Sequence, residues 1–144
     1  MEIVESRDMT AGLLAAVNGL LPQLSTAARP LNAAELAALM QAEASRLFMA
    51  VEEGKYYGML TLICFAAPTG RRARIEDLVV DAGARGKGVG RRLVHCALQA
   101  AERWGARAVE LTSNPARIAA NGLYRQMGFE PQPTNVYRLA LPRG

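Results

Sequence analysis

Apolar residues recur at helical spacing in two segments near the start of the chain. In residues 9–21 they return every three or four positions, and Asp8 stands where an N-cap residue is expected. Pro22 should end or kink this helix, because proline lacks the N–H group that a helix interior uses. Asn32, with Glu35 three positions later, has the spacing of a capping box and predicts the start of a second helix.

Two further helices are expected in the second half of the chain. One covers residues 89–104, where the apolar side chains fall on a single face, and Gly105 should end it. The other follows Asn114, which we expect to act as its cap, with Pro115 at the first helical position. This last helix should end before Gly128.

Apolar runs of strand length alternate with these helices, and Gly58 marks a possible bulge in one of them. We expect strands at residues 1–6, 46–52, 56–67, 75–80, 106–113 and 135–141. The alternation of strands and helices predicts a single α/β domain over residues 1–144. Its sheet should be mixed, mainly antiparallel and flanked by helices.

A glycine-rich stretch separates the strand ending at Val80 from the helix that follows it. Residues 85–92 read Arg-Gly-Lys-Gly-Val-Gly-Arg-Arg and would form a helix N-terminus whose unpaired N–H groups attract an anion. Glycines allow the backbone to approach a bulky pyrophosphate. A Walker loop is excluded because Lys87 is followed by Gly88 rather than Ser or Thr, and the glycine spacing does not fit a dinucleotide-binding fingerprint.

The pattern that does fit is Arg-x-x-Gly-x-Gly, which is formed by Arg85, Gly88 and Gly90. It resembles the acyl-CoA-binding signature of the GNAT superfamily of N-acyltransferases. The resemblance is specific over residues 74–129, from a strand similar to the family's fourth to a helix similar to its closing helix. That helix, in residues 119–129, has the family's Tyr…Gly-Phe ending.

The resemblance implies a GNAT-like fold in which the fourth and fifth strands splay apart and hold acetyl-CoA as co-substrate. It places the pantetheine arm along the backbone of the fourth strand and the pyrophosphate on the glycine-rich loop. Many relatives carry asparagine where this chain has Arg117, and we expect Arg117 to meet a cofactor phosphate instead. The expected cofactor-binding residues are Leu78, Val79, Val80, Arg85, Gly86, Lys87, Gly88, Val89, Gly90, Arg91, Asn114, Arg117 and Asn121.

Acyl transfer to an amine also needs a group that accepts the amine proton and one that protonates the leaving thiolate. The resemblance assigns the acid role to Tyr124, whereas its helical position alone favours a packing tyrosine. Glu76 is the expected base, directly or through water, with Asp77 in reserve. The structural alternative for Glu76 is an ion pair with Arg74. His95, the only histidine, lies off the apolar stripe and is expected on the surface.

The charge balance supports a competing interpretation. Seventeen Lys and Arg against 13 Asp and Glu give a net charge of +4 and a pI near 9.5, values compatible with nucleic-acid binding. Aromatic residues make up only 6% of the chain and do not alternate with the basic residues. We therefore expect no nucleic-acid partner and attribute the excess charge to a polyanionic cofactor and a solvated surface.

Other features concern the cellular setting. No apolar run approaches the roughly 18–20 residues of a membrane span. The acidic residues Glu2, Glu5 and Asp8 stand where a signal peptide would be basic, so we expect a cytoplasmic protein with no membrane partner. Cys64 and Cys96 suit small core residues in a reducing compartment, and neither Cys nor His shows metal-ligand spacing.

The predicted function is an N-acetyltransferase whose primary amine attacks acetyl-CoA directly in a ternary complex. The acceptor stays open among small molecules, peptide N-termini and lysine side chains. Scattered acidic residues in the first 45 positions disfavour polyamines and aminoglycosides. The alternative from another class is a non-catalytic acyl-CoA-binding regulatory module. A homodimer is compatible with the resemblance, because many relatives pair.

Overall fold

The computed structural model describes residues 1–142, which fall into two compact units. The second unit starts at Ser113 and contains α4 (Ile118–Gln126). No helix within residues 1–142 is long and apolar enough to cross a membrane. The first unit, Met1–Thr112, contains β1 (Glu2–Ser6), α1 (Ala11–Leu24), α2 (Ala33–Gln41), β2 (Ser45–Glu52), β3 (Lys55–Ala67), β4 (Gly70–Val80), the 3₁₀ turn η1 (Ala82–Ala84), α3 (Val89–Trp104) and β5 (Val109–Glu110).

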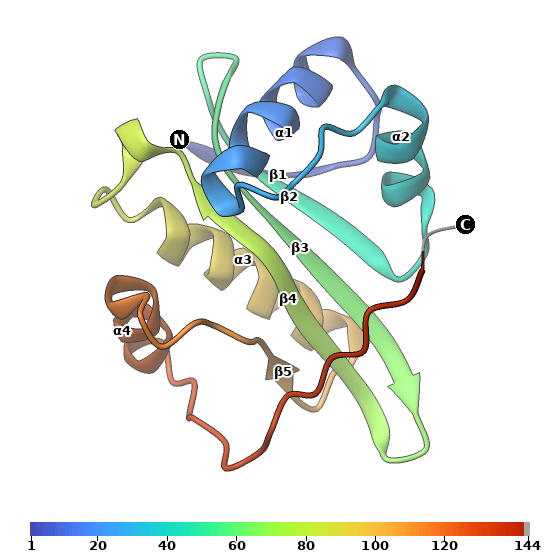
Figure 1. Cartoon of the computed structure of the whole chain (residues 1–144), viewed down its shortest axis with the longest axis vertical. Coiled ribbons are helices and arrows are strands. Elements are labelled where there is room, and N and C mark those ends of the chain that lie inside the picture. Colours follow the sequence, from blue (N-terminus) through green and yellow to red (C-terminus); the bar gives the residue numbers. More distant parts are fainter. Residues whose placement is uncertain (143–144) are drawn as a thin grey trace. The chain divides into compact units, whose positions relative to one another are not determined.

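A five-stranded sheet with the order β1-β2-β3-β4-β5 forms the frame of the first unit (Figure 1). The first four strands pair antiparallel with their neighbours, and β5 pairs parallel to β4. This confirms the predicted α/β class with a mixed, mainly antiparallel sheet. A parallel pair needs a crossover connection, which α3 supplies between β4 and β5.

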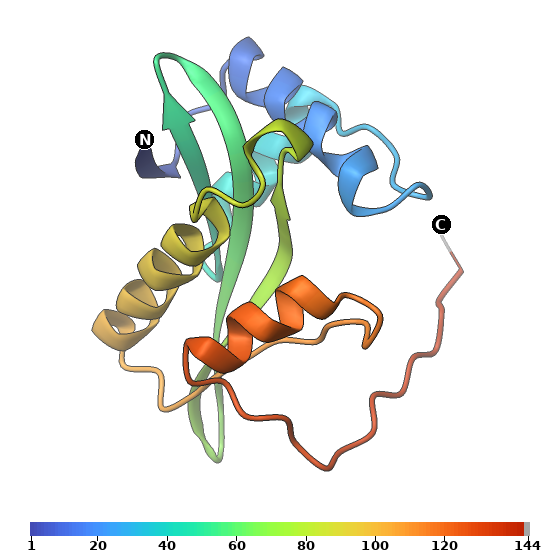
Figure 2. The same cartoon turned by 90° about the vertical axis from the view of Figure 1, so that its left-hand side faces the viewer.

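Helices cover both faces of this sheet, with α1 and α2 on one side and α3 on the other (Figure 2). On its side α3 buries the stripe that the spacing predicts, although Trp104 at its end is only partly buried. The core between α1, α2 and the sheet consists of Leu13, Val17, Leu20, Leu36, Leu47, Met49, Met59 and Val79.

The ends of α1 differ from the prediction. Thr10, not Asp8, is the cap, because its Oγ1 accepts a hydrogen bond from the Leu13 N–H at 3.0 Å. Pro22 lies inside α1 rather than ending it. Since it falls in the last turn, its missing N–H removes only one helical bond and the helix continues to its end.

The other helix ends of the first unit are as predicted. Asn32 and Glu35 form a reciprocal capping box, in which the Glu35 N–H donates to Asn32 at 2.8 Å and the Asn32 N–H donates to Glu35 at 3.0 Å. Gly105 ends α3 in a left-handed conformation, with φ at 95°. Sequence patterns therefore place α2 and α3 well.

The second unit corrects the prediction for the last helix. The helix begins at Ile118 and not directly after Pro115. The side-chain oxygen of Asn114 accepts a hydrogen bond from the Ala116 N–H at 2.8 Å, which forms a local turn instead of a helix cap. Asparagine commonly forms such turns, and the sequence does not distinguish them from caps.

Two expected strands are also corrected. The ladder with β4 covers only Val109–Glu110 of the expected strand 106–113, although backbone bonds at Arg107 and Ala108 extend the contact. Residues 135–141 lie outside any strand among the residues that the structure describes. Their alternation of apolar and polar side chains suits a strand, but a strand also needs a partner for its backbone groups.

A β-bulge interrupts β4 close to its end. Thr61 pairs with Glu76 and Met59 pairs with Val79, so two residues of β4, Asp77 and Leu78, stand opposite one residue of β3. Asp77 adopts a left-handed φ of 52°. A bulge breaks the strict alternation of side chains between the two faces of a sheet. Alternation alone therefore does not place Glu76 and Asp77 on opposite faces.

Gly58 of β3 lies close to both β4 and α3, beside a second bulge in the ladder of β2 and β3. An added Cβ would lie 3.0 Å from the Val79 carbonyl oxygen and 3.1 Å from Leu93. We expect Gly58→Ala to lower the free energy of unfolding by about 1–3 kcal/mol, because the backbone must shift. Urea denaturation measures this loss.

The matched control is Gly19→Ala, where the added Cβ meets nothing within 4 Å on the exposed side of α1. That change should raise the free energy of unfolding by roughly 0.5–1 kcal/mol through helix propensity. Equal effects of the two substitutions would contradict the close packing at Gly58.

Candidate functional site

The glycine-rich loop connects η1 to α3 on the exposed surface of the first unit. Gly86 and Gly88 both have φ at 78°, a left-handed conformation that side chains with a Cβ rarely adopt. The side chains of Arg85 and Lys87 are exposed on the same loop. The loop therefore combines a tight backbone path with positive charge.

The N-terminus of α3 presents backbone N–H groups to this loop. Gly88 is the N-cap residue and has no side chain with which to cap the first turn. The first N–H groups of a helix have no intrahelical acceptor, and the positive end of the helix dipole adds to their attraction for an anion. Val89 is one of the expected cofactor-binding residues and is only 3% exposed. Its side chain is therefore buried, and only its backbone could contact a cofactor. These features fit a phosphate group.

The end of β4 next to this loop lacks a full partner on one edge. Its ladder with β5 consists of the pairs Ala73–Val109 and Arg74–Glu110, whereas β4 continues to Val80. On its other edge β4 stays paired with β3 up to Gly58–Val80. The two strands thus part after Arg74, which leaves one edge of the last part of β4 without a β5 ladder, as expected for the splayed strands.

Glu76 and Asp77 lie on this last part of β4, at the bulge. Glu76 is ion-paired with Arg74, with 3.2 Å between Arg74 Nε and Glu76 Oε1. The ion pair with Arg74, which the sequence offers as the alternative to a role as base, is therefore formed. Partial removal of the Asp77 carboxylate from water raises its pKa, and the nearby charge of Glu76 raises it further.

The expected site residues of the second unit lie in the turn before α4 and along the helix itself. Asn121 donates from Nδ2 to the carbonyl oxygens of Arg117 at 2.8 Å and Asn114 at 3.0 Å, so its amide nitrogen holds the turn before the helix. Tyr124 is buried and packs edge-on against Phe129, with ring centroids 5.9 Å apart. Burial raises the pKa of its hydroxyl, and the charge of Arg117 partly offsets that rise.

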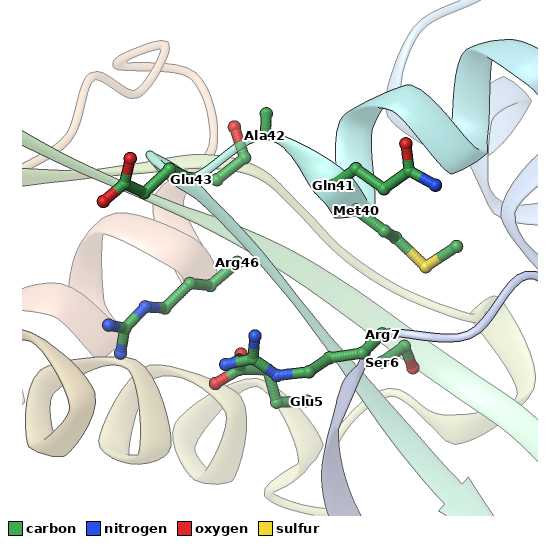
Figure 3. Close-up of a pocket in the computed structure, with 9 residues that line it drawn as sticks. Glu5, Ser6, Arg7, Met40, Gln41, Ala42, Glu43 and Arg46 are labelled. Atoms are coloured by element: carbon green, nitrogen blue, oxygen red, sulfur yellow. Dashed lines mark ion pairs between the residues drawn. The ribbon is translucent and has the colours of Figure 1, made fainter.

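A pocket of about 220 Å³ lies elsewhere in the first unit, where the end of β1 meets the connection from α2 to β2 (Figure 3). Glu5 and Arg7 form an ion pair at its rim. The sequence does not reveal it, because two segments far apart in the chain, residues 5–7 and 40–46, build it. None of the expected site residues belongs to it. Its lining residues are Glu5, Ser6, Arg7, Met40, Gln41, Ala42, Glu43, Ser45 and Arg46.

Two other expectations concern cysteine and histidine. Cys64 is buried and Cys96 is partly buried, and both thiols are free. His95 is exposed on α3, as expected. Within residues 1–142 no group of three or more His, Cys, Asp or Glu side chains could hold a metal ion.

Comparison with known families shows that one family profile covers the glycine-rich loop, β4, β5 and α4. The sequence profile of the acetyltransferase (GNAT) family matches residues 17–129, which is more than half of the chain. This chain belongs to the GNAT acetyltransferase family. The matched region contains the glycine-rich loop, Glu76 and Tyr124.

Solved structures with the same fold have different names. A transcriptional regulator from Bacillus halodurans C-125 aligns at 25% identity and a TM-score of 0.82, over 96% of this chain and 99% of that chain. A ribosomal-protein-alanine N-acetyltransferase from Brucella melitensis biovar Abortus 2308 aligns at 21% identity and a TM-score of 0.77, over 98% and 100% of the two chains. An aminoglycoside N-acetyltransferase in complex with CoA aligns at 18% identity and a TM-score of 0.77, over 96% and 93%. No curated protein sequence matches the chain.

The raised pKa of Asp77 leads to a prediction about pH. In an NMR titration its carboxyl should change charge above the ordinary aspartate value of 3.8, and Glu76→Gln should lower that midpoint by removing a like charge. The folded chain then binds this proton more tightly than the unfolded chain does. The contribution of Asp77 to the free energy of unfolding therefore falls as the pH rises from 3.8 through the folded pKa.

Glu110→Gln is the matched control, because the same neutralisation at β5 should leave the Asp77 midpoint unchanged. A midpoint at or below the ordinary value in the unaltered protein would contradict the partly dehydrated position of Asp77.

Proposed function

We propose that this chain is an acetyl-CoA-dependent N-acetyltransferase that transfers the acetyl group to a primary amine. One observation carries the proposal: the glycine-rich loop at the uncapped start of α3 adjoins the part of β4 that has no β5 ladder. The first feature suits a pyrophosphate, and the second leaves backbone groups for a pantetheine amide chain. Members of the GNAT family use acetyl-CoA, and residues 1–144 would act as one such domain.

The proposed reaction is a direct acyl transfer. The amine nitrogen attacks the thioester carbonyl carbon, a C–N bond forms, and the C–S bond breaks to release CoA. The amine gives up a proton to a base, and the sulfur receives one from an acid. Tyr124 can fill the acid role because a tyrosine hydroxyl is protonated at neutral pH, although burial raises its pKa and so makes it a weaker acid.

Glu76 is the proposed base, and its ion pair with Arg74 sets a condition on that role. Arg74 contacts Oε1 at 3.2 Å, so either this oxygen exchanges its partner for the amine proton or the proton goes to Oε2, directly or through water. Asp77 is the reserve base at the same bulge, and its raised pKa favours proton acceptance over an ordinary aspartate.

The acceptor does not follow from the fold. One solved relative is named for a ribosomal-protein alanine and another for aminoglycosides, although both share this fold. The regulator from Bacillus halodurans, which also shares the fold, supports one second candidate: a non-catalytic acyl-CoA-binding regulatory module. That candidate predicts acetyl-CoA binding without turnover.

Tyr124→Phe tests the proposed acid. We expect acetyl-CoA to bind as before and amine-dependent thiol release to fall at least roughly tenfold, because the thiolate must then leave without a proton donor. Thiol release from acetyl-CoA is measured across a panel of peptides, lysine peptides, amino acids, polyamines and aminoglycosides. Binding is measured by calorimetry on the same samples.

Tyr137→Phe is the control, since it removes the same hydroxyl from an exposed tyrosine of the second unit. Unchanged release in Tyr124→Phe would remove Tyr124 as the acid. Acetyl-CoA binding with no release for any amine would favour the regulatory module, and no acetyl-CoA binding at all would contradict both candidates.

A further inference from the structure

A side-chain clamp joins α1 to the turn that leads into the glycine-rich loop. Gln23 of α1 donates from Nε2 to Oδ1 of Asp81 at 2.9 Å, and its Oε1 accepts a hydrogen bond from the Ala82 N–H at 2.9 Å. The second carboxylate oxygen of Asp81 accepts from the Gly83 N–H at 3.0 Å. Both ends of the Gln23 amide are therefore used, each with a partner of the opposite hydrogen-bonding character.

This clamp acts on the turn between β4 and the glycine-rich loop, which backbone bonds also hold. Asp81 follows the last residue of β4, and its N–H and carbonyl form short backbone bonds to Tyr57 and Ala84. These bonds fix the 3₁₀ turn itself, whereas Gln23 ties that turn to α1. Arg85, the next residue after the turn, starts the glycine-rich loop and donates from Nε to the Val80 carbonyl at 3.2 Å.

We propose that Gln23 is a positioning residue for the acyl-CoA-binding loop and that its clamp on Asp81 sets the affinity for acetyl-CoA. The inference rests on the proposed function, because it assumes that the loop binds the cofactor. Gln23 would touch no part of acetyl-CoA. It acts through the side chain of Asp81 and the backbone N–H of Ala82, and these two bonds fix where the loop begins.

The charge state of Asp81 agrees with this arrangement. The hydrogen bond from Gln23 and the backbone bond from Gly83 lower its pKa, and the charge of Arg85 adds to the effect. The carboxylate therefore stays an acceptor on both oxygens at neutral pH. In this charge state each of its two oxygens accepts one hydrogen bond, from Gln23 Nε2 and from the Gly83 N–H.

The donor and acceptor pattern allows a swap of the two side chains. In Asp81→Asn, the amide oxygen must still accept from Gly83, so the new NH₂ group faces the NH₂ group of Gln23. In Gln23→Glu, two carboxylates face each other. In the double variant, the NH₂ group introduced at position 81 donates to one oxygen of the carboxylate introduced at position 23. The other oxygen of that carboxylate accepts from Ala82, which restores every bond.

The test is a double-mutant cycle in which calorimetry measures the acetyl-CoA dissociation constant of the full chain. We expect each single variant to bind roughly five- to tenfold more weakly and the double variant to bind like the unaltered protein. Gln41→Glu, the same change at the exposed end of α2, is the control and should leave binding unchanged.

Asp81→Asn separates positioning from charge. If only the charge near the phosphates mattered, removal of this negative charge would tighten binding. Tighter or unchanged binding in Asp81→Asn, or a double variant no better than the singles, would overturn the inference.

Amide hydrogen exchange at Ala82 gives a readout that does not depend on acetyl-CoA. It should accelerate in both single variants and return to normal in the double variant. If exchange at Ala82 became faster while the affinity for acetyl-CoA stayed unchanged, the clamp would exist but would not set cofactor binding. That result would also overturn the inference. If the unaltered protein failed to bind acetyl-CoA, the proposed function itself would fail first.

Discussion

The ladder between β3 and β4 positions the two features of the first unit that the proposed cofactor site uses, the end of β4 and the glycine-rich loop. It runs from the hairpin at Gly70 to the pair Gly58–Val80, and it holds the end of β4 in place after β5 has left the sheet. With β3 on one side, β4 can keep its other edge free of a ladder without losing its position. The same strand then passes directly into η1 and the loop, so the position of the loop depends on this ladder.

Two devices refine that position. The bulge at Asp77 interrupts the alternation of side chains just before the strand ends, in the part of β4 that has no β5 ladder. The clamp from Gln23 then fixes the turn that follows. The end of β4 thus carries Asp77 and the ion-paired Glu76, whereas the loop carries the exposed cations Arg85 and Lys87, which suit phosphates.

Much of this arrangement is readable from the sequence, and the rest depends on contacts between distant segments. The loop at Arg85–Gly90, the helix after it and the capping box at Asn32 carry local signals, so they could be predicted. The Gln23 clamp and the pocket near Glu5 could not, since each joins segments far apart in the chain. Residues 135–141 show the reverse case, in which a good local pattern does not by itself form a strand.

The most direct test of this account is an NMR titration of the protein with CoA, in which backbone amide shifts report where the cofactor binds. The account predicts that the amides of Gly86, Gly88 and Gly90 show the largest shifts, because their N–H groups surround the proposed pyrophosphate site. Unmoved loop amides, with the largest shifts around Glu5 and Arg46 instead, would contradict the assignment of the cofactor to the start of α3.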